Sequence, residues 1–277
     1  MSAARKEPAS IALLLRALKL PAFVAHHVQV AEQAERQGWS FGDYLKHLCE
    51  VEVEERRCRR IERNLRGSNL PREKTLATLD LSRLPAKLRR QLPTLCEGGF
   101  IEHAENVLAF GLPGRGKTHL ICAIGHELIQ RGHTVFFTPA FALVQQLLAA
   151  RRDLALEKAL RRLDRFDAVI VDDIGYIQQD RDEMEVLFTF LSERYERKSV
   201  MLTSNLVFSQ WDRIFKDPMT TAAAVDRVVH HAQILELTGP SYRTDEAKKH
   251  NDKTAVENPH AQEAANQKSG RTEVATP

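Results

Sequence analysis

A glycine-rich stretch, GLPGRGKT at residues 111–118, constrains the fold of this 277-residue chain more than any other feature. It follows a short apolar run at residues 107–110 and precedes a helical pattern that begins near His119. The pattern G-x-x-x-x-G-K-T between a strand and a helix is typical of the phosphate-binding P-loop, in which backbone N–H groups and a helix N-terminus surround an anion. The sequence therefore predicts an α/β protein that binds a nucleoside triphosphate. The competing interpretation is a plain glycine-rich turn.

The loop residues have distinct expected roles. Lys117 is expected to reach the β- and γ-phosphates, and the Thr118 hydroxyl is expected to take one position around Mg²⁺. We therefore predict ATP and Mg²⁺ as cofactors. The residues expected to contact the nucleotide are consecutive: Gly111, Leu112, Pro113, Gly114, Arg115, Gly116, Lys117, Thr118 and His119.

Two carboxylates follow a second apolar run, at residues 168–171. A P-loop needs an acidic partner for Mg²⁺ at the end of a nearby strand, and Asp172 is predicted to supply it, often through water. Asp173 is then placed to orient or deprotonate the attacking water. Many such ATPases have a glutamate there, so the shorter Asp173 predicts slow hydrolysis. The alternative is that the two aspartates only cap a loop.

Three later polar residues are further candidates for the catalytic site. Asn205 ends a predicted strand and could position the water or sense the γ-phosphate, although Asn is also a common turn residue. Arg227, on a predicted helix, could complete the site of a neighbouring subunit. Arg243 could contact the nucleotide of its own subunit. The alternative for Arg227 and Arg243 is an ordinary surface arginine.

Apolar runs and helical patterns alternate after residue 106. This alternation predicts a parallel sheet with helices on both faces. The predicted strands are 107–110, 134–138, 168–172, 199–204 and 233–237, and the helices between them include 117–131, 153–165, 182–197 and 221–232.

A basic helical region precedes the sheet. A helix is predicted from Phe41 to about Arg66, starting with a capping box at Ser40 and Asp43. Its glutamates come first and its arginines later, which suits the helix dipole and permits i,i+4 pairs. The surplus of arginines predicts contact with DNA phosphates, and a solvated helix face is the alternative. The arginines are Arg56, Arg57, Arg59, Arg60, Arg63 and Arg66, and the apolar face is predicted at Phe41, Tyr44, Leu45, Leu48, Val51, Cys58, Ile61 and Leu65.

Charge and composition divide the chain. The net charge is +3, while residues 1–100 carry 18 Lys and Arg against 12 Asp and Glu, which favours an anionic partner, nucleic acid first. The predicted divisions are a helical basic domain at 1–70 that binds DNA or a partner, a linker with a short helix at 71–105, an ATPase domain at 106–244 and a disordered polar tail at 245–277.

Other features make competing classes of protein less plausible. No stretch has the length of a membrane span, the N-terminus does not resemble a secretory signal, and the four cysteines form no C-x-x-C pair, so we expect a cytoplasmic protein. His230 and His231 are adjacent within the predicted 221–232 helix. Because neighbouring positions on a helix point to different sides, we do not expect them to bind a metal together.

The motifs ENVLAFGLPGRGKTHL, VIVDDIGY, LSERYERKSVMLTSN and DRVVHHAQILELTGPSYR occur in this order. Over about residues 10–244 the chain resembles the IstB family of insertion-sequence transposition helper ATPases, relatives of the helicase loader DnaC and the initiator DnaA. The resemblance implies an AAA+ fold, Asn205 as sensor 1, Arg227 as the arginine finger and Arg243 as sensor 2. It also implies a homo-oligomer with ATP at subunit interfaces that deforms duplex DNA and presents it to a partner transposase. Asp173 and the long tail depart from the family pattern.

Three functions remain open at this stage. The first is an ATP-dependent transposition helper whose ATPase is slow and stimulated by DNA or by a partner. The second is a DnaC-like loader of a replicative helicase, which would prefer single-stranded DNA. The third is an architectural DNA-binding protein with an almost inactive ATPase, an alternative that depends on Asp173.

Overall fold

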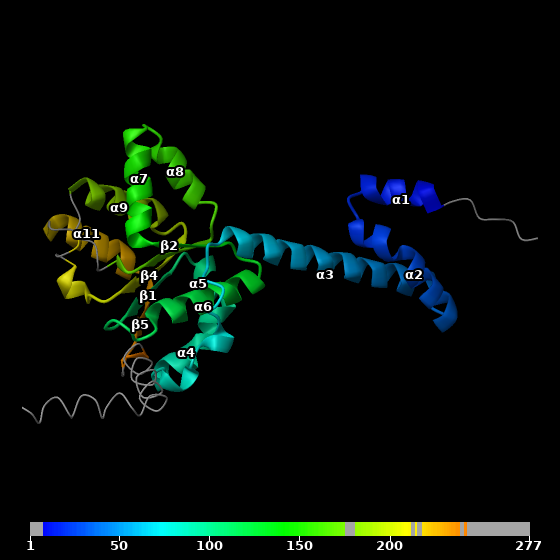
Figure 1. Ribbon diagram of the computed structural model, residues 1–277, viewed down its shortest axis with the longest axis horizontal. Coiled ribbons are helices and arrows are strands. Elements are labelled where there is room, and N and C mark those ends of the chain that lie inside the picture. The colour runs from blue at the N-terminus through cyan, green and yellow to red at the C-terminus, as the bar shows by residue number, and fades with distance from the viewer. Residues whose placement is uncertain (1–7, 175–180, 212–213, 215–217, 239–240, 243–277) are drawn as a thin grey trace, which may run out of the picture.

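Five parallel strands build the sheet at the centre of the larger part of the molecule (Figure 1). The strands lie in the order β2-β3-β4-β1-β5, which confirms the predicted parallel sheet flanked by helices. The computed structural model describes residues 8–174, 181–211, 214, 218–238 and 241–242. The strands are β1 (Asn106–Phe110), β2 (Val135–Pro139), β3 (Ala168–Asp172), β4 (Ser199–Ser204) and β5 (Ala232–Glu236).

The three inner strands, β3, β4 and β1, are buried along their whole length, as expected for apolar strands covered on both faces. β1 pairs with β4 and β5, and β3 pairs with β4. In this register Phe110 lies beside Ser204, and Val171 lies beside Leu202. The carboxyl ends of β1, β3 and β4 therefore meet at one edge of the sheet. The P-loop follows β1 at this edge, Asp172 is the last residue of β3, and Asn205 follows β4.

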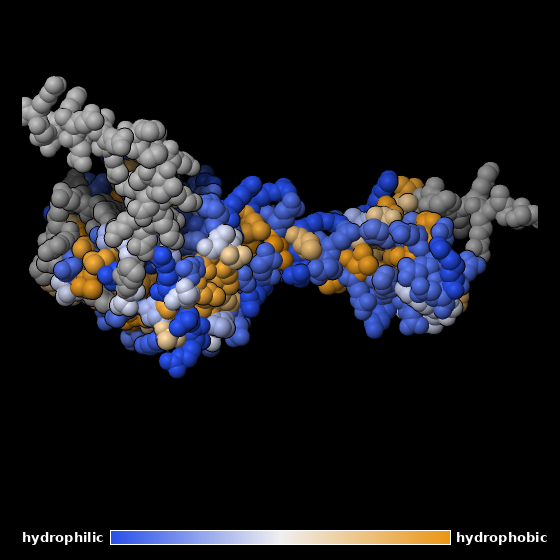
Figure 2. All heavy atoms as spheres, turned by 60° about the horizontal axis from the view of Figure 1, so that its bottom comes forward, coloured by the Kyte–Doolittle hydropathy of each residue, from blue (hydrophilic) through white to orange (hydrophobic). Residues whose placement is uncertain are grey.

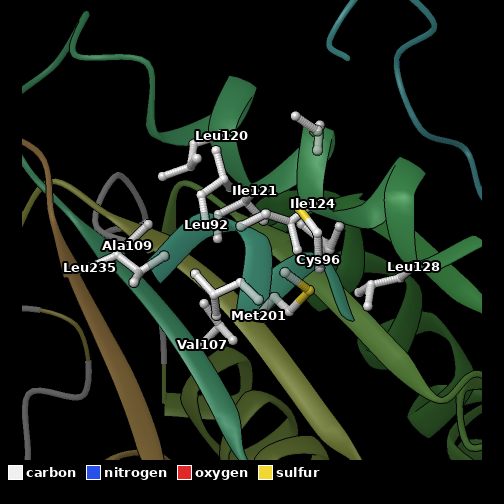
Figure 3. Close-up of a cluster of buried hydrophobic side chains, with 14 of the residues drawn as sticks. Leu92, Cys96, Val107, Ala109, Leu120, Ile121, Ile124, Leu128, Met201 and Leu235 are labelled. Carbon is white, nitrogen blue, oxygen red and sulfur yellow. The ribbon is translucent and has the colours of Figure 1, made fainter. Parts of the chain in front are cut away.

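Each face of the sheet carries its own apolar core. On one face Cys96 and Ile121, from two helices, pack against Val107 and Met201 of the strands (Figure 3). The other face is covered by four helices whose core includes Phe190. The first face has α4 (Ala86–Glu97), α5 (Gly99–Glu102) and α6 (Lys117–Gln130), and the second has α7 (Ala140–Arg152), α8 (Leu156–Leu163), α9 (Arg181–Arg194) and α11 (Pro218–Val229).

A single long helix, α3 (Phe41–Gly67), joins the sheet-containing body to a small helical body (Figure 1). Its 27 residues span about 40 Å. The predicted capping box is confirmed, with the Asp43 N–H donating to Ser40 Oγ at 3.1 Å. At the end of α3 away from the sheet, α2 (Pro21–Gln37) packs against it, and α1 (Pro8–Ala17) packs against α2. In the part of the chain that the structure describes, no helix is long and apolar enough to cross a membrane.

The predicted apolar face of α3 is only partly correct. Leu48 is buried against α2, and Ile61 is buried against the sheet-containing body. Phe41 is 96% exposed, and Leu45 and Cys58 are also exposed. The helix connects two bodies and packs against a different one at each end, so one uninterrupted buried face does not form. The narrow waist that this leaves between the bodies is visible in Figure 2.

Two segment boundaries near the end of the sheet differ from the prediction. The helix predicted at 221–232 is α11, which ends at Val229, and the strand predicted at 233–237 is β5, which begins at Ala232. His230 and His231 therefore lie in a turn. Arg243 and the predicted tail at 245–277 lie outside the described residues. The predicted linker contains two short 3₁₀ turns, Leu76–Thr78 and Leu81–Arg83.

A buried arginine, Arg194, connects several elements on the second face of the sheet through hydrogen bonds. Arg194, at the end of α9, is 1% exposed. Its guanidinium donates to the carbonyls of Leu163, Phe166 and Ser199, each at 3.0 Å. Burial lowers its pKa to about 10, against the opposing effect of nearby Asp164. This arginine provides hydrogen bonds for carbonyl groups at the ends of α8, the following turn and the start of β4.

Candidate nucleotide site

The P-loop connects β1 to α6, as its sequence pattern predicts. Gly111 needs its missing side chain, since a Cβ there would lie 2.5 Å from the Leu237 carbonyl oxygen. Gly116 has a φ of +81° and lies under the Tyr242 ring, where a Cβ would be 3.3 Å from the nearest ring atom. α6 begins at Lys117, so the positive end of its dipole faces the interior of the loop.

The two residues predicted to hold Mg²⁺ are in direct contact. Thr118 Oγ1 donates to Asp172 Oδ1 at 2.8 Å, which joins the P-loop helix to the end of β3. Asp172 is 9% exposed. A hydroxyl and a carboxylate are the oxygen ligands that Mg²⁺ prefers. The donor set at this position therefore fits the predicted cation.

Lys117 is almost completely buried, at 6% exposed. Its Nζ donates to the Leu112 carbonyl oxygen at 3.2 Å. This contact holds the ammonium group within the loop. The predicted contact of Lys117 with the β- and γ-phosphates stays a prediction.

Thr203, on β4, was not predicted and organises both aspartates. Its Oγ1 donates to Asp172 Oδ1 at 2.6 Å and accepts the Asp173 N–H at 2.8 Å. Asp173 has a φ of +59°, in the left-handed region that Asp tolerates better than most residues. A threonine directly after the apolar run at residues 200–202, two residues before Asn205, is the signal that could have identified Thr203.

Asn205 lies where β4 ends, close to the P-loop. Its Oδ1 is buried and has no hydrogen-bond partner in the part of the chain that the structure describes. Together with Leu112 and Arg115 it lines a cavity of about 440 Å³ at the carboxyl edge of β1, β4 and β5. A buried polar atom of this kind usually serves a bound ligand or water. The role of Asn205 at the γ-phosphate stays a prediction.

Arg227 is not at the nucleotide site of its own chain. It lies on α11, where Nη1 donates to Ser192 Oγ of α9 at 2.5 Å and the guanidinium lies 4.6 Å from the centre of the Phe188 ring. The structure therefore shows an intramolecular role for this side chain. Its predicted role in a neighbouring subunit stays a prediction.

Tyr242, which the sequence did not predict as a site residue, packs against one side of the P-loop. The Tyr242 N–H donates to the Gly114 carbonyl at 2.8 Å, and its hydroxyl donates to the Asp80 carbonyl at 3.1 Å. The Arg83 guanidinium lies 4.5 Å from the centre of the same ring. Burial raises the pKa of Tyr242. The linker and the segment that leads to Arg243 thus both reach the P-loop.

His119, next to Thr118 of the P-loop, is in contact with two residues of the linker. Its Nε2 lies 3.1 Å from Thr78 Oγ1 and 3.2 Å from the Thr75 carbonyl oxygen. The side chain therefore connects the first turn of α6 to the linker.

The arginines predicted to contact DNA lie along α3, far from the nucleotide site. The predicted i,i+4 pairs of Arg56, Arg59 and Arg66 with Glu52, Glu55 and Glu62 are all confirmed. Arg57 pairs with Glu54 at 2.8 Å, one turn before it. These pairs reduce the net positive charge of the helix, but the arginines stay accessible to solvent, because their four side chains are 49–71% exposed. Arg60 and Arg63 are also exposed.

The site and the sheet define a P-loop ATP-binding protein with the AAA+ fold. Among solved structures, the replication initiator DnaA bound to AMPPCP and single-stranded DNA aligns with a TM-score of 0.53 and 17% identity, over 62% of this chain and 52% of that one. DnaI aligns with a TM-score of 0.50 and 22% identity, over 63% of this chain and 94% of that one. At these identities the likeness shows the fold alone.

Sequence comparison identifies the family. Residues 13–250 match the family model described as IstB-like ATP binding protein, and the chain belongs to this family. A putative insertion sequence ATP-binding protein of Sinorhizobium fredii is 44% identical over 90% of this chain and 85% of the relative. The insertion sequence IS21 putative ATP-binding protein of Pseudomonas aeruginosa is 35% identical over 86% of this chain and 89% of the relative.

Proposed function

We propose that this protein is an ATP-dependent helper of transposition that assembles on duplex DNA, remodels it and delivers it to a partner transposase. The observation that carries the proposal is the contact of Thr118 with Asp172 at the base of the P-loop, in a chain whose relatives are named insertion sequence ATP-binding proteins. The names of these relatives favour this function over that of a helicase loader.

Each residue at the sheet edge has a defined part in ATP hydrolysis. Lys117 and the N-terminus of α6 neutralise the phosphates, and Thr118 and Asp172 would hold Mg²⁺. A bound Mg²⁺ would supply positive charge that stabilises the phosphate oxygens. Asp173 orients the attacking water or accepts its proton, and the buried Asn205 oxygen holds that water in line. The short side chain of Asp173 makes the step slow.

Subunit contact completes the site in this proposal. Arg227 uses one of its five N–H donors on Ser192, so its guanidinium keeps donors for the γ-phosphate of an adjacent protomer. Arg243, which follows Tyr242 at the P-loop, is proposed to contact the nucleotide of its own subunit. ATP then favours the oligomer, because the nucleotide contacts two protomers at once.

The first experiment measures assembly on duplex DNA by electron microscopy, with and without ATP. Wild type is expected to form oligomers only with ATP, and Lys117→Ala is expected to form none. Asp173→Asn separates assembly from hydrolysis, since it should assemble but not release phosphate. Equal assembly of wild type and Lys117→Ala in all conditions would contradict the proposal. A stronger preference for single-stranded DNA would support the helicase loader instead.

A mixing experiment tests the role of Arg227 between subunits. Lys117→Ala and Arg227→Ala are each expected to be inactive alone. When mixed, they form interfaces that join an intact P-loop to an intact arginine, so part of the ATPase activity should return. If the mixture stays inactive while Arg227→Ala lowers the thermal midpoint, the arginine serves only the α9–α11 contact.

A further inference from the structure

Three potential metal ligands meet at the edge of the sheet opposite the nucleotide site. Glu196 lies in the turn between α9 and β4, and His230 and His231 form the turn between α11 and β5. His230 Nδ1 and His231 Nε2 each lie 4.0 Å from Glu196 Oε1. The three ligand atoms all lie within 4.8 Å of one another, and the centroids of the two imidazole rings are 4.0 Å apart.

This arrangement contradicts the expectation that the two histidines diverge. That expectation assumed that both lie on a helix, but α11 ends at Val229. In the turn that follows, both rings approach the same carboxylate. α9 and α11, which lead into the two turns, lie side by side (Figure 1).

We propose that Glu196, His230 and His231 bind a divalent transition-metal ion, and we take Zn²⁺ as the ion with which to test the site. Two imidazole nitrogens and one carboxylate oxygen form a donor set that suits Zn²⁺, Cu²⁺ or Ni²⁺ better than Mg²⁺. Bonds of about 2.1 Å to a tetrahedral ion place ligand atoms about 3.4 Å apart. Small rotations of the side chains therefore close the site.

The surroundings of the three ligands suit a bound ion. Their side chains are 51–56% exposed, so they can rotate and leave a fourth position for water. Tyr195 Oη lies 2.9 Å from His230 Nδ1. A metal ion bound at this nitrogen would replace that hydrogen bond, and the tyrosine hydroxyl would then lie beside the metal ligands. The observations behind this proposal do not depend on the proposed roles in ATP and DNA binding.

The ion would connect the two turns that hold α9 and α11. Arg227 of α11 already bonds Ser192 of α9, only a few residues from the proposed ligands. Metal binding is therefore expected to stabilise the α9–α11 contact and to restrict the movement of Arg227.

Calorimetric titration of the full-length, nucleotide-free protein with Zn²⁺ tests the site. Wild type is expected to show a site that His230→Ala/His231→Ala lacks and that Glu196→Gln weakens by about tenfold or more. Three control variants should keep this site: His103→Ala for another exposed histidine, His250→Ala/His260→Ala for the C-terminal histidines, and Asp172→Asn for the nucleotide site. Unchanged Zn²⁺ binding by the His230→Ala/His231→Ala variant would overturn the proposal.

Cobalt spectroscopy gives a second readout that a loss of folding cannot imitate. Co²⁺ in the wild-type site is expected to produce visible absorption bands that Zn²⁺ then removes. The Glu196→Gln variant, checked for a native circular dichroism spectrum, should show altered bands. Bands in this variant identical to those of wild type would place the ion elsewhere and reject the site.

Discussion

At the scale of single residues, the Thr203 hydroxyl links the two aspartates of the nucleotide site. It donates to Asp172 and accepts from the Asp173 N–H. Thr203→Val keeps the shape of the side chain but leaves the N–H without this acceptor, which should lower the free energy of unfolding by about 1–3 kcal/mol. The rate of ATP hydrolysis should fall as well, because Asp172 and Asp173 lose their fixed positions.

Phosphate release and chemical denaturation together check this prediction. Thr203→Ser is the matched control, since it keeps the hydroxyl, and should remain close to wild type in both measurements. A valine variant with the stability and hydrolysis rate of wild type would mean that the hydroxyl does not organise the site.

The sequence predicted those site residues whose signal is local. The P-loop and the aspartates after β3 are short patterns with a known physical purpose, and the structure places Thr118 against Asp172 as expected. Thr203 and Tyr242 were missed because their roles depend on the register of β4 and on contacts between distant segments. No periodicity within a short window reports such contacts.

At the scale of secondary-structure elements, Arg194 joins α8, α9 and β4 through backbone carbonyls. Arg194→Met removes the donors and leaves these carbonyls buried without partners, so we expect a loss of about 3–5 kcal/mol in the free energy of unfolding. Denaturant titration measures it. Arg197→Met is the control, because that side chain is 60% exposed and should change stability by less than about 1 kcal/mol. Similar losses in both variants would contradict the role assigned to Arg194.

Glu52 connects α3 to α2 in the small helical body. This α3 residue is 3% exposed and accepts the Ala22 N–H at the start of α2. Burial raises its pKa, but the hydrogen bonds from Arg56 and from the N–H groups of Ala22 and Phe23 outweigh this effect, so the pKa lies below its ordinary value of 4.5. The ionised carboxylate therefore contributes stability above about pH 4.5, and this contribution is lost as the pH falls through the lower folded pKa.

Glu52→Gln should accordingly destabilise the helical body at neutral pH, with a difference from wild type that shrinks in acid. Thermal unfolding followed by circular dichroism at several pH values measures the trend. Glu50→Gln, at a solvent-exposed position of the same helix, should show little difference at any pH. A Glu52→Gln effect that is independent of pH would show that packing, and not charge, is responsible.

The ends of elements were harder to predict than their existence. The start of α3 was predictable because its capping box is local. The end of α11 was misplaced by three residues, because the sequence from Arg227 to Ile234 has no glycine or proline to mark it. That error placed His230 and His231 on a helix and concealed their common approach to Glu196.

At the scale of the whole molecule, the exposed arginines of α3 give a prediction about DNA affinity. If Arg60 and Arg63 contact phosphates, the double change to glutamine should lower the slope of log affinity against log salt by about two. Binding to duplex DNA at several salt concentrations measures it. Arg161→Gln, an exposed arginine of α8, should leave the slope unchanged. An unchanged slope in the double variant would favour the solvated helix face.

The long helix α3 also has a mechanical consequence. Its last turns pack against α6, which begins at the P-loop. Its other end packs against α2, which in turn packs against α1. A rod of about 40 Å converts a rotation of ten degrees at one end into a displacement of roughly 7 Å at the other. Any tilt of the sheet-containing body would therefore be magnified at α1 and α2, at the other end of α3.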